Sequence, residues 1–392
     1  MQTRRHLLRS ALATAATLAT PWATLSLAAA PAPSANRFVF VILRGGMDGL
    51  HAVPAVGDPA WADARGSLAQ FASPPLALDG PFALHPLLLQ LHAMYGRREL
   101  AVLHAVGLPY RERSHFDAQQ VLESGGTRPY ELATGWLGRA LPVGALRAVG
   151  LTTAVPLVLR GPTEVDTWAP SAMPEPSIDL VTRLAAMYQG DPALAQALAR
   201  ARGLRDEPGM ATTPAGAGGG SRGAAVALAT KAADFLQRNS QIAVLEMGGW
   251  DSHTNQGAPN GAIANNLRTL DATLAALREG LLAGDVWRRT VVVVATEFGR
   301  EVAVNGNQGT DHGTGGAAFV LGGAVDGGRV LADWPGLARK DRHEGRDLRV
   351  TTDLRAALRP ILADHLHVPT AMLDSSVLPG SAAVRPLALL RG

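Results

Sequence analysis

The feature that most constrains the fold is a series of short apolar runs separated by longer amphipathic stretches. The apolar runs cover residues 38–43, 100–103, 155–159, 242–245, 291–294 and 317–321. Helical patterns occupy residues 83–96, 115–124, 178–202, 222–238, 261–283 and 352–366. A run that is apolar at every position is typical of a strand buried on both faces. Such strands alternating with helices predict an α/β fold, with a mainly parallel central sheet flanked by helices.

The composition excludes several classes of site. The chain of 392 residues contains no cysteine, which excludes a disulfide framework, a thiol nucleophile and a zinc–thiolate centre. Lysine and arginine number 36 and aspartate and glutamate 33, but Arg4, Arg5 and Arg9 lie in an acid-free leader. The remaining chain therefore has 33 basic and 33 acidic residues. A nucleic-acid-binding protein needs a net basic face, so we expect no nucleic-acid partner.

Residues 1–30 have the pattern of a secretory signal. Paired arginines precede an alanine-rich apolar stretch that ends in small residues. The pair resembles a twin-arginine signal, so we expect export through the twin-arginine machinery to the periplasm or the exterior. An uncleaved membrane anchor is the alternative; no other run approaches the roughly 18 apolar residues of a spanning helix. After cleavage we expect no stable membrane span, and a single domain over residues 31–392 with a flexible Gly/Ala-rich loop at about 203–223.

Polar residues follow two of the apolar runs directly. In an α/β sheet, functional residues gather beyond the carboxyl ends of the strands. The first run continues into LRGGMDGL, which places Asp48 at the sheet edge as a metal ligand or as a residue that stabilises the glycine turn. Residues 242–245 lead to Asp251 and His253, whose side chains point the same way on an extended segment. This pair suits zinc, iron or manganese, although a hydrogen-bonded pair without a metal would have the same pattern.

A third apolar run, residues 291–294, leads to Glu297 and Arg300. Arg300 could pair with Glu297 or hold an anionic substrate through two parallel hydrogen bonds. Asp311 and His312 follow between glycines, which suggests backbone packed closely around a site; a solvated loop is the alternative.

Ser114 and Asp117 precede a predicted helix in a Ser-x-x-Asp capping pattern. A cap alone explains both residues. The amino end of a helix is also an anion site that could activate the Ser114 hydroxyl. Both interpretations stay open from the residues alone.

Taken together, the motifs resemble the family called "domain of unknown function 1501". They are LRGGMDGL, ALHP, GLPYRERSHFDAQ, GWLGRAL, GGWDSHTNQ, TEFGRE and GTDHGTGG, from about Arg37 to about Leu366. That family is similar to the alkaline phosphatase and sulfatase superfamily. The resemblance implies metal ligands at Asp48, at Asp251 with His253, at Glu297 and at His312, and a nucleophile at Ser114.

The sequence also departs from the superfamily pattern. Phe298 stands where a ligating histidine is usual, and Asp251 and His253 are two residues apart instead of four. These departures argue against a complete two-metal site and leave one metal ion, or none, as the alternative.

The sequence thus supports two main functions, and a metalloenzyme of other chemistry is a third alternative. The first is an exported hydrolase of a phosphate or sulfate ester, a glycan included. It would use a divalent zinc, manganese, iron or calcium ion, with Asp311 also near the metal and Arg44 or Arg300 binding the anion. The second is a non-catalytic periplasmic binding or assembly protein that keeps the fold with a degenerate metal site.

Overall fold

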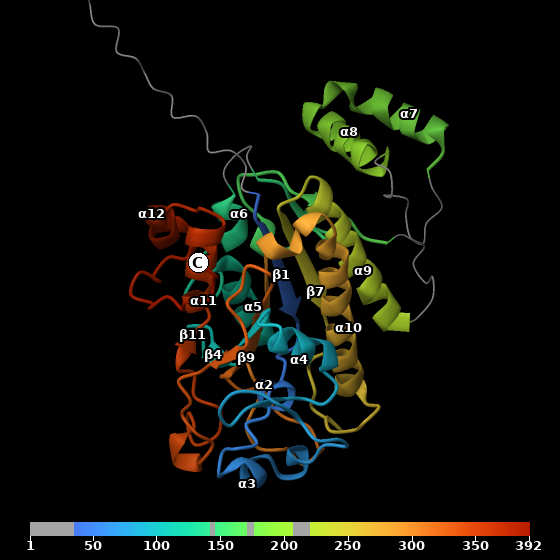
Figure 1. Cartoon of the computed structure of the whole chain (residues 1–392). Coiled ribbons are helices and arrows are strands. Elements are labelled where there is room, and N and C mark those ends of the chain that lie inside the picture. Colours follow the sequence, from blue (N-terminus) through green and yellow to red (C-terminus); the bar gives the residue numbers. More distant parts are fainter. Residues whose placement is uncertain (1–34, 142–145, 171–175, 207–219) are drawn as a thin grey trace, which may run out of the picture. The chain divides into compact units, whose positions relative to one another are not determined.

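The computed structural model describes residues 35–141, 146–170, 176–206 and 220–392 (Figure 1). The predicted signal at residues 1–30 lies outside these residues, as do residues 207–219 of the predicted loop. Among the helices of the described ranges, none combines the length and apolarity needed to cross a membrane.

Within the described residues, nine strands form one sheet in the order β10-β4-β9-β8-β1-β7-β5-β6, and β11 pairs with β4. Their bounds are β1 Arg37–Leu43, β4 Leu100–Gly107, β5 Ala148–Gly150, β6 Asp166–Thr167, β7 Ile242–Met247, β8 Thr290–Thr296, β9 Gly316–Leu321, β10 Arg329–Leu331 and β11 Thr352–Asp353. β9 runs antiparallel to β4 and β8, and the other pairs are parallel. The predicted α/β fold with a mainly parallel sheet is confirmed. A separate antiparallel pair joins β2 Leu76–Ala77 to β3 Ala83–Leu84.

Helices flank both faces of this sheet. The helices of the described residues are α2 Gly49–Ala52, α3 Trp61–Arg65, α4 Leu89–Gly96, α5 His115–Ser124, α6 Trp136–Ala140, α7 Ile178–Met187, α8 Pro192–Asp206, α9 Gly220–Arg238, α10 Ala262–Leu282, α11 Arg355–Pro360 and α12 Thr370–Met372. Alternate residues of β1 enter two different apolar clusters, one on each face of the sheet. The first cluster packs against α4, α9 and α10, and the second against α5, α6 and α11.

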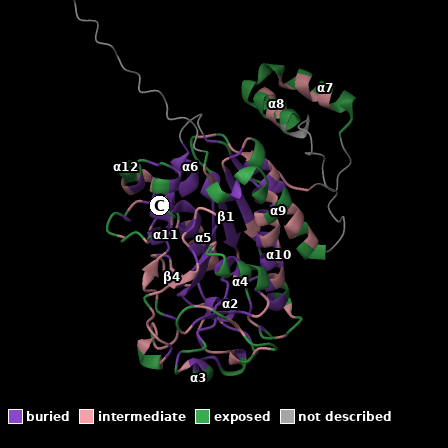
Figure 2. Ribbon diagram, viewed as in Figure 1, coloured by how far each residue is buried: buried purple, intermediate pink, exposed green. Residues whose placement is uncertain are grey.

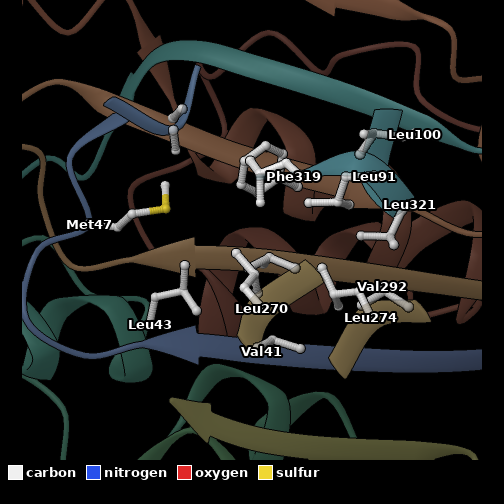
Figure 3. Close-up of a cluster of buried hydrophobic side chains, with 14 of the residues drawn as sticks. Val41, Leu43, Met47, Leu91, Leu100, Leu270, Leu274, Val292, Phe319 and Leu321 are labelled. Atoms are coloured by element: carbon white, nitrogen blue, oxygen red, sulfur yellow. The ribbon is translucent and has the colours of Figure 1, made fainter. Parts of the chain in front are cut away.

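The central strands are mostly purple in Figure 2, which marks most of their residues as buried. Figure 3 shows Val41 and Leu43 of β1 beside Leu270 and Leu274 of α10. All four side chains are fully buried. Full burial of a valine or leucine stabilises the fold by about 1.5–3 kcal/mol. This explains why the uninterrupted apolar runs predicted the central strands.

Three sequence predictions about elements are corrected. Residues 155–159 are not a strand: Leu157–Leu159 form a 3₁₀ turn packed against α6, and Pro156 has no N–H for a ladder. The single helix predicted at 178–202 is two, because α8 begins anew at Pro192. The predicted loop is shorter at both ends, since α8 continues to Asp206 and α9 begins at Gly220.

The topology brings several loops to one edge of the sheet. Leu43 lies level with Met247 of β7 and with Thr296 of β8, so these three parallel strands end together. Because β9 is antiparallel, its first residue, Gly316, lies at the same edge. The segments after β1, β7 and β8 and the segment before β9 therefore meet there.

Candidate functional site

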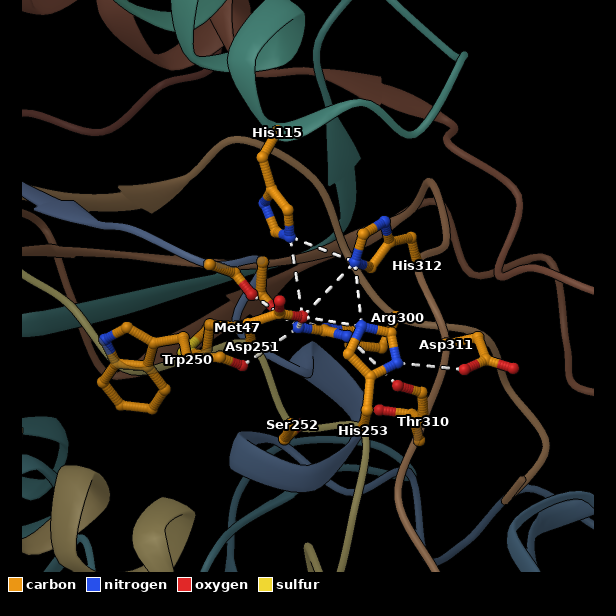
Figure 4. Close-up of polar contacts among 12 residues, drawn as sticks. Met47, His115, Trp250, Asp251, Ser252, His253, Arg300, Thr310, Asp311 and His312 are labelled. Carbon is orange, nitrogen blue, oxygen red and sulfur yellow. Dashed lines mark hydrogen bonds and ion pairs between the residues drawn. The ribbon is translucent and has the colours of Figure 1, made fainter. Parts of the chain in front are cut away.

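Three imidazole rings and one carboxylate converge at this edge of the sheet (Figure 4). His115 begins α5, Asp251 and His253 follow β7, and His312 precedes β9. The Nε2 atom of His312 lies 3.0 Å from Nε2 of His115, 3.1 Å from Nε2 of His253 and 3.3 Å from Oδ1 of Asp251. Oδ1 of Asp251 is 2.9 Å from Nε2 of His253 and 3.5 Å from Nε2 of His115.

The other nitrogen of each ring faces an oxygen that can only accept a hydrogen bond. The three contacts are His115 Nδ1 with Glu297 Oε1 at 2.8 Å, His253 Nδ1 with Asp311 Oδ1 at 3.0 Å, and His312 Nδ1 with the Arg113 carbonyl oxygen at 3.0 Å. Each Nδ1 therefore carries the proton and donates it. In a neutral imidazole the remaining nitrogen then has a free lone pair. When all three rings are neutral, three such lone pairs and a carboxylate oxygen face one another.

This donor set fits a metal ion. Electron-rich atoms at these distances repel one another unless a proton or a metal cation lies between them. Histidines that bind metals usually donate their other N–H to a carboxylate or a carbonyl, as all three do here. Atoms bound to one zinc ion at about 2.0–2.1 Å lie about 3.3 Å apart in a tetrahedron. The ligand atoms of His115, Asp251 and His312 all lie within 4.8 Å of one another, and His253 contacts two of them.

Glu297 is held as a carboxylate behind His115. Burial acts to raise its pKa, but hydrogen bonds from His115, Gln119 and the Gly45 amide lower the pKa to about 2. Gln119 Nε2 donates at 3.0 Å and the Gly45 nitrogen at 2.8 Å. The same hydrogen bond with Glu297 raises the pKa of His115. Glu297 is 1% exposed and orients the ring from behind.

Arg300 fixes Asp251. Its guanidinium is buried, and its Nη2 donates to Oδ1 of Asp251 and to two backbone carbonyls, while Nε and Nη1 each donate to one further carbonyl. The carbonyl acceptors are Gly45 at 2.6 Å, Gly46 at 2.7 Å, Thr310 at 3.1 Å and Trp250 at 3.2 Å. Burial acts to raise the pKa of Asp251, but Arg300 brings it to about 2. Every Arg300 nitrogen has an acceptor, and its predicted role as an anion clamp stays a prediction.

Glycines let the loops come this close. Gly45 has φ +116°, and a Cβ there would lie 2.6 Å from the Asp251 nitrogen. A Cβ on Gly313 would lie 2.4 Å from the Arg300 carbonyl carbon. Larger residues at these two positions would push the loops apart.

Among the described residues, Arg44 does not contact the histidine cluster directly and lies in a network with two carboxylates. Its Nη2 donates to Glu246 at 2.6 Å and to Glu123 at 2.9 Å, and its Nη1 donates to Gln119 at 3.1 Å. Gln119 connects this network to Glu297. The predicted contact of Arg44 with a substrate anion stays a prediction.

Asp48 is buried apart from the converging atoms. Its carboxylate pairs with Arg65 at 2.5 Å and accepts from Gln256 at 2.6 Å. It also caps α2 by accepting from the Leu50 and His51 amides. The structure does not bring Asp48 into the histidine cluster.

Ser114 is the N-cap of α5, and its hydroxyl accepts from the Asp117 amide at 3.5 Å. Its predicted nucleophilic role is not tested by this contact. The neighbouring His115 was not predicted as a site residue. The available signal was its place in RSHFDA, where a polar histidine directly follows a predicted helix cap.

Comparison with known proteins gives one family. The profile described as "Protein of unknown function (DUF1501)" matches residues 99–368, which include all of the converging residues but neither Arg44 nor Asp48. No curated protein matches the sequence significantly.

Several solved structures have a similar fold at low identity. A phosphonate monoester hydrolase of Agrobacterium radiobacter is 12% identical, with 85% of this chain and 74% of that chain covered and a TM-score of 0.41. A putative sulfatase from Bacteroides thetaiotaomicron is 10% identical, with 90% and 74% covered and a TM-score of 0.41. A sulfatase from Pseudoalteromonas sp. is also 10% identical, with 90% and 70% covered and a TM-score of 0.43.

Proposed function

Because this chain belongs to the family described as "Protein of unknown function (DUF1501)", whose description states no activity, we propose a function from the site itself. The protein is a metal-dependent hydrolase of sulfate or phosphate esters. The observation that carries the proposal is the convergence of the Nε2 atoms of three histidines and the Asp251 carboxylate on one point.

Each residue of the site has a distinct role. His115, Asp251 and His312 would hold a divalent ion, with His253 beside them. Such an ion, when bound, acts as a Lewis acid and lowers the pKa of a hydroxyl or water. Arg300 supports this site by keeping the Asp251 carboxylate in place.

Ser114 is the proposed nucleophile. It lies directly before His115 at the amino end of the ten-residue helix α5, where the helix dipole favours a negative charge. Its hydroxyl accepts a long hydrogen bond from the Asp117 amide, at 3.5 Å, and also interacts with the Tyr110 hydroxyl. Ser114→Ala should reduce turnover at least about 100-fold. The lost cap should cost about 0.5–1 kcal/mol of unfolding free energy.

We further propose that the enzyme works outside the cytoplasm, on esters that include sulfated or phosphorylated glycans. The twin-arginine pattern of residues 1–30 supports this location. Replacing Arg4 and Arg5 by lysine should retain the protein in the cytoplasm, as fractionation would measure. Unchanged export would contradict this route.

The test of hydrolysis uses protein stripped of metal and reloaded separately with zinc, manganese, iron or calcium. Chromogenic aryl sulfates and aryl phosphates serve as substrates. We expect turnover with at least one metal and a loss of at least about 100-fold in Asp251→Asn and in His312→Gln. His104→Gln is the matched control, because His104 is buried away from the cluster. Full turnover in Asp251→Asn, or in metal-free protein, would contradict the proposal.

A second function is favoured by one observation. Phe298 packs against the rings of His115 and His312, with centroids 4.7 and 5.2 Å apart, where a further ligand would otherwise be expected. A non-catalytic binding protein could keep a metal for structure alone. Stoichiometric metal with no turnover of any ester would favour this function.

A further inference from the structure

One face of α5 carries three polar side chains at intervals of four residues, His115, Gln119 and Glu123. Residues four apart lie one above the other on a helix, so the three side chains form a single row. His115 and Gln119 contact Glu297, at 2.8 and 3.0 Å. Gln119 and Glu123 contact Arg44, at 3.1 and 2.9 Å. Arg44 directly follows β1 and Glu297 directly follows β8, so the row joins α5 to two strand ends.

The amide of Gln119 has only one favourable orientation between its two partners. Its Oε1 accepts from Nη1 of Arg44, and a guanidinium has N–H donors but no acceptor. Its Nε2 donates to Oε1 of Glu297, and a carboxylate has acceptors but no donor. A flipped amide would place N–H groups against the guanidinium and its carbonyl oxygen against the carboxylate. The orientation of Gln119 is therefore set by a charged group on each side.

Arg44 is also held by two carboxylates. Its Nε and Nη2 donate to the two oxygens of Glu246, at 2.9 and 2.6 Å, and Nη2 also donates to Glu123 at 2.9 Å. An arginine has five N–H donors. One is used on Nε, two on Nη2 and one on Nη1, so four of the five have acceptors. Because two parallel hydrogen bonds to one carboxylate fix the plane of a guanidinium, Arg44 is a firm anchor for Gln119.

The row ends at the ring of His115. Nδ1 of this ring donates to Oε1 of Glu297, the same oxygen that accepts from Gln119 and, at 2.8 Å, from the Gly45 amide. Nε2 of the ring then lies 3.0 Å from Nε2 of His312. Gln119 and His115 therefore share one acceptor atom, and a displacement of that oxygen would turn the ring.

We propose that Arg44 and Gln119 are positioning residues of the metal site: Arg44 orients the amide of Gln119, and Gln119 holds the Glu297 carboxylate against His115. Within the described residues, the side-chain contacts of this pair with the site run through Glu297. The inference rests on the proposed function only in that a metal ion binds at His115. It gives Arg44 a role other than contact with a substrate anion, and the two roles predict different measurements.

The first test exchanges the amide and the carboxylate. Glu297→Gln alone places two amides in contact, and we expect zinc affinity in calorimetric titration to fall about 10–100-fold. In Glu297→Gln/Gln119→Glu, the amide at position 297 can donate to the carboxylate at position 119 and still accept from His115. We expect the double variant to recover at least about fivefold over Glu297→Gln alone. No recovery would overturn the inference, whereas no zinc binding in the wild type would overturn the proposed function.

A milder pair of variants on α5 keeps the inference testable if the exchanged protein does not fold. Gln119→Met removes both hydrogen bonds of the amide and should weaken zinc affinity by about threefold to tenfold, because Gln119 acts through a partner of a ligand. Gln120→Met is the matched control, since Oε1 of Gln120 has no hydrogen-bond partner within the described residues. Its zinc affinity should stay within about twofold of the wild type. Equal affinities in the two variants would overturn the inference.

The second test concerns Arg44. Arg44→Lys keeps a positive charge beside Glu123 and Glu246 but loses the fork that also reaches Gln119. We expect zinc affinity to fall by about threefold to tenfold, with no further loss when Gln119→Met is added, because both variants break one series of contacts. Additive losses would overturn the inference. An unchanged zinc affinity with a raised KM for an aryl sulfate would also overturn it, by assigning Arg44 to the substrate.

Discussion

Two sets of three histidines differ in the groups that contact the ring nitrogens and the ring faces. In the converging set, each Nδ1 donates to a carboxylate or carbonyl, and each Nε2 faces the centre of the site. In the buried set, the rings pack among aromatic side chains, and burial lowers their pKa values to about 4, about 3 and about 4. The converging set is His115, His253 and His312; the buried set is His51, His85 and His104.

His104 shows the difference most clearly. Its Nδ1 accepts from the Ala105 amide at 2.8 Å, and its Nε2 donates to the Val53 carbonyl at 2.9 Å. Both nitrogens are therefore occupied by the backbone, and the ring is neutral. The partner of the ring, and not the residue type, decides whether a histidine can bind a cation.

Removing a ring from the converging set should have the largest effect on metal affinity. We expect His312→Ala to weaken metal affinity at least about 100-fold, since it removes one ligand and the contact that orients two others. The unfolding free energy of the metal-free protein should change by less than about 1 kcal/mol, because the side chain is partly exposed. Calorimetric titration and chemical denaturation measure the two quantities.

His104→Ala is the matched control from the buried set. It should cost about 2–3 kcal/mol, because it leaves a cavity and two unpaired backbone groups. Its metal affinity should stay within about threefold of the wild type. If both variants lost metal equally, the distinction between the two sets would be wrong.

Removing the carboxylate of Glu297, which orients His115, should have the second largest effect on metal affinity. Glu297→Gln replaces the acceptor behind His115 with an amide that can present its N–H₂ instead. We expect metal affinity to fall by about 10–100-fold. Glu246→Gln, which changes a carboxylate on Arg44 instead, is the control and should have less than about a threefold effect. An unchanged affinity in Glu297→Gln would show that His115 needs no support from this side.

The buried set should make stability depend on pH. The folded pKa values of about 3 to 4 lie below the value of about 6.5 of an exposed histidine, so below pH 6.5 the unfolded chain binds protons that the folded chain does not. This stability is complete above about pH 6.5 and falls toward pH 4, by up to about 1.4 kcal/mol per pH unit for each ring.

The difference in unfolding free energy between the wild type and His104→Gln isolates the contribution of one ring of the buried set. Chemical denaturation between pH 7 and pH 5 should show a smaller slope in the variant. Identical slopes would mean that His104 is not neutral in the folded protein.

The smallest effect is expected at Asp311, the most exposed of the supporting carboxylates. Its side chain is 49% exposed and also accepts from Asn305. Asp311→Asn should weaken metal affinity by less than about tenfold, because solvent screens the lost charge. If metal affinity fell as much as in Glu297→Gln, the greater exposure of Asp311 would not make it a weaker support for the metal site than Glu297.

Much of the site edge was predictable because it follows buried strands. Asp251, His253 and Glu297 follow within a few residues of apolar runs, and the sheet brings those ends together. The contribution of β9 was less accessible, since nothing in its apolar run indicates that it is antiparallel.

Two other features could not be predicted for physical reasons. His115 follows a loop and not a strand, so the rule of strand ends does not reach it. The partner of Asp48 lies 17 residues away on another helix, and no sequence periodicity indicates a buried pair with Arg65. Residues 155–159 are apolar because the 3₁₀ turn within them packs against α6. An apolar run of this length is therefore no proof of a strand.

Anomalous diffraction at the zinc edge, from crystals of the zinc-loaded protein, tests the central claim most directly. One peak is expected, at about 2.0–2.1 Å from Nε2 of His115, Nε2 of His312 and Oδ1 of Asp251. The absence of a peak there, or a peak bound by Asp48, would contradict the site described.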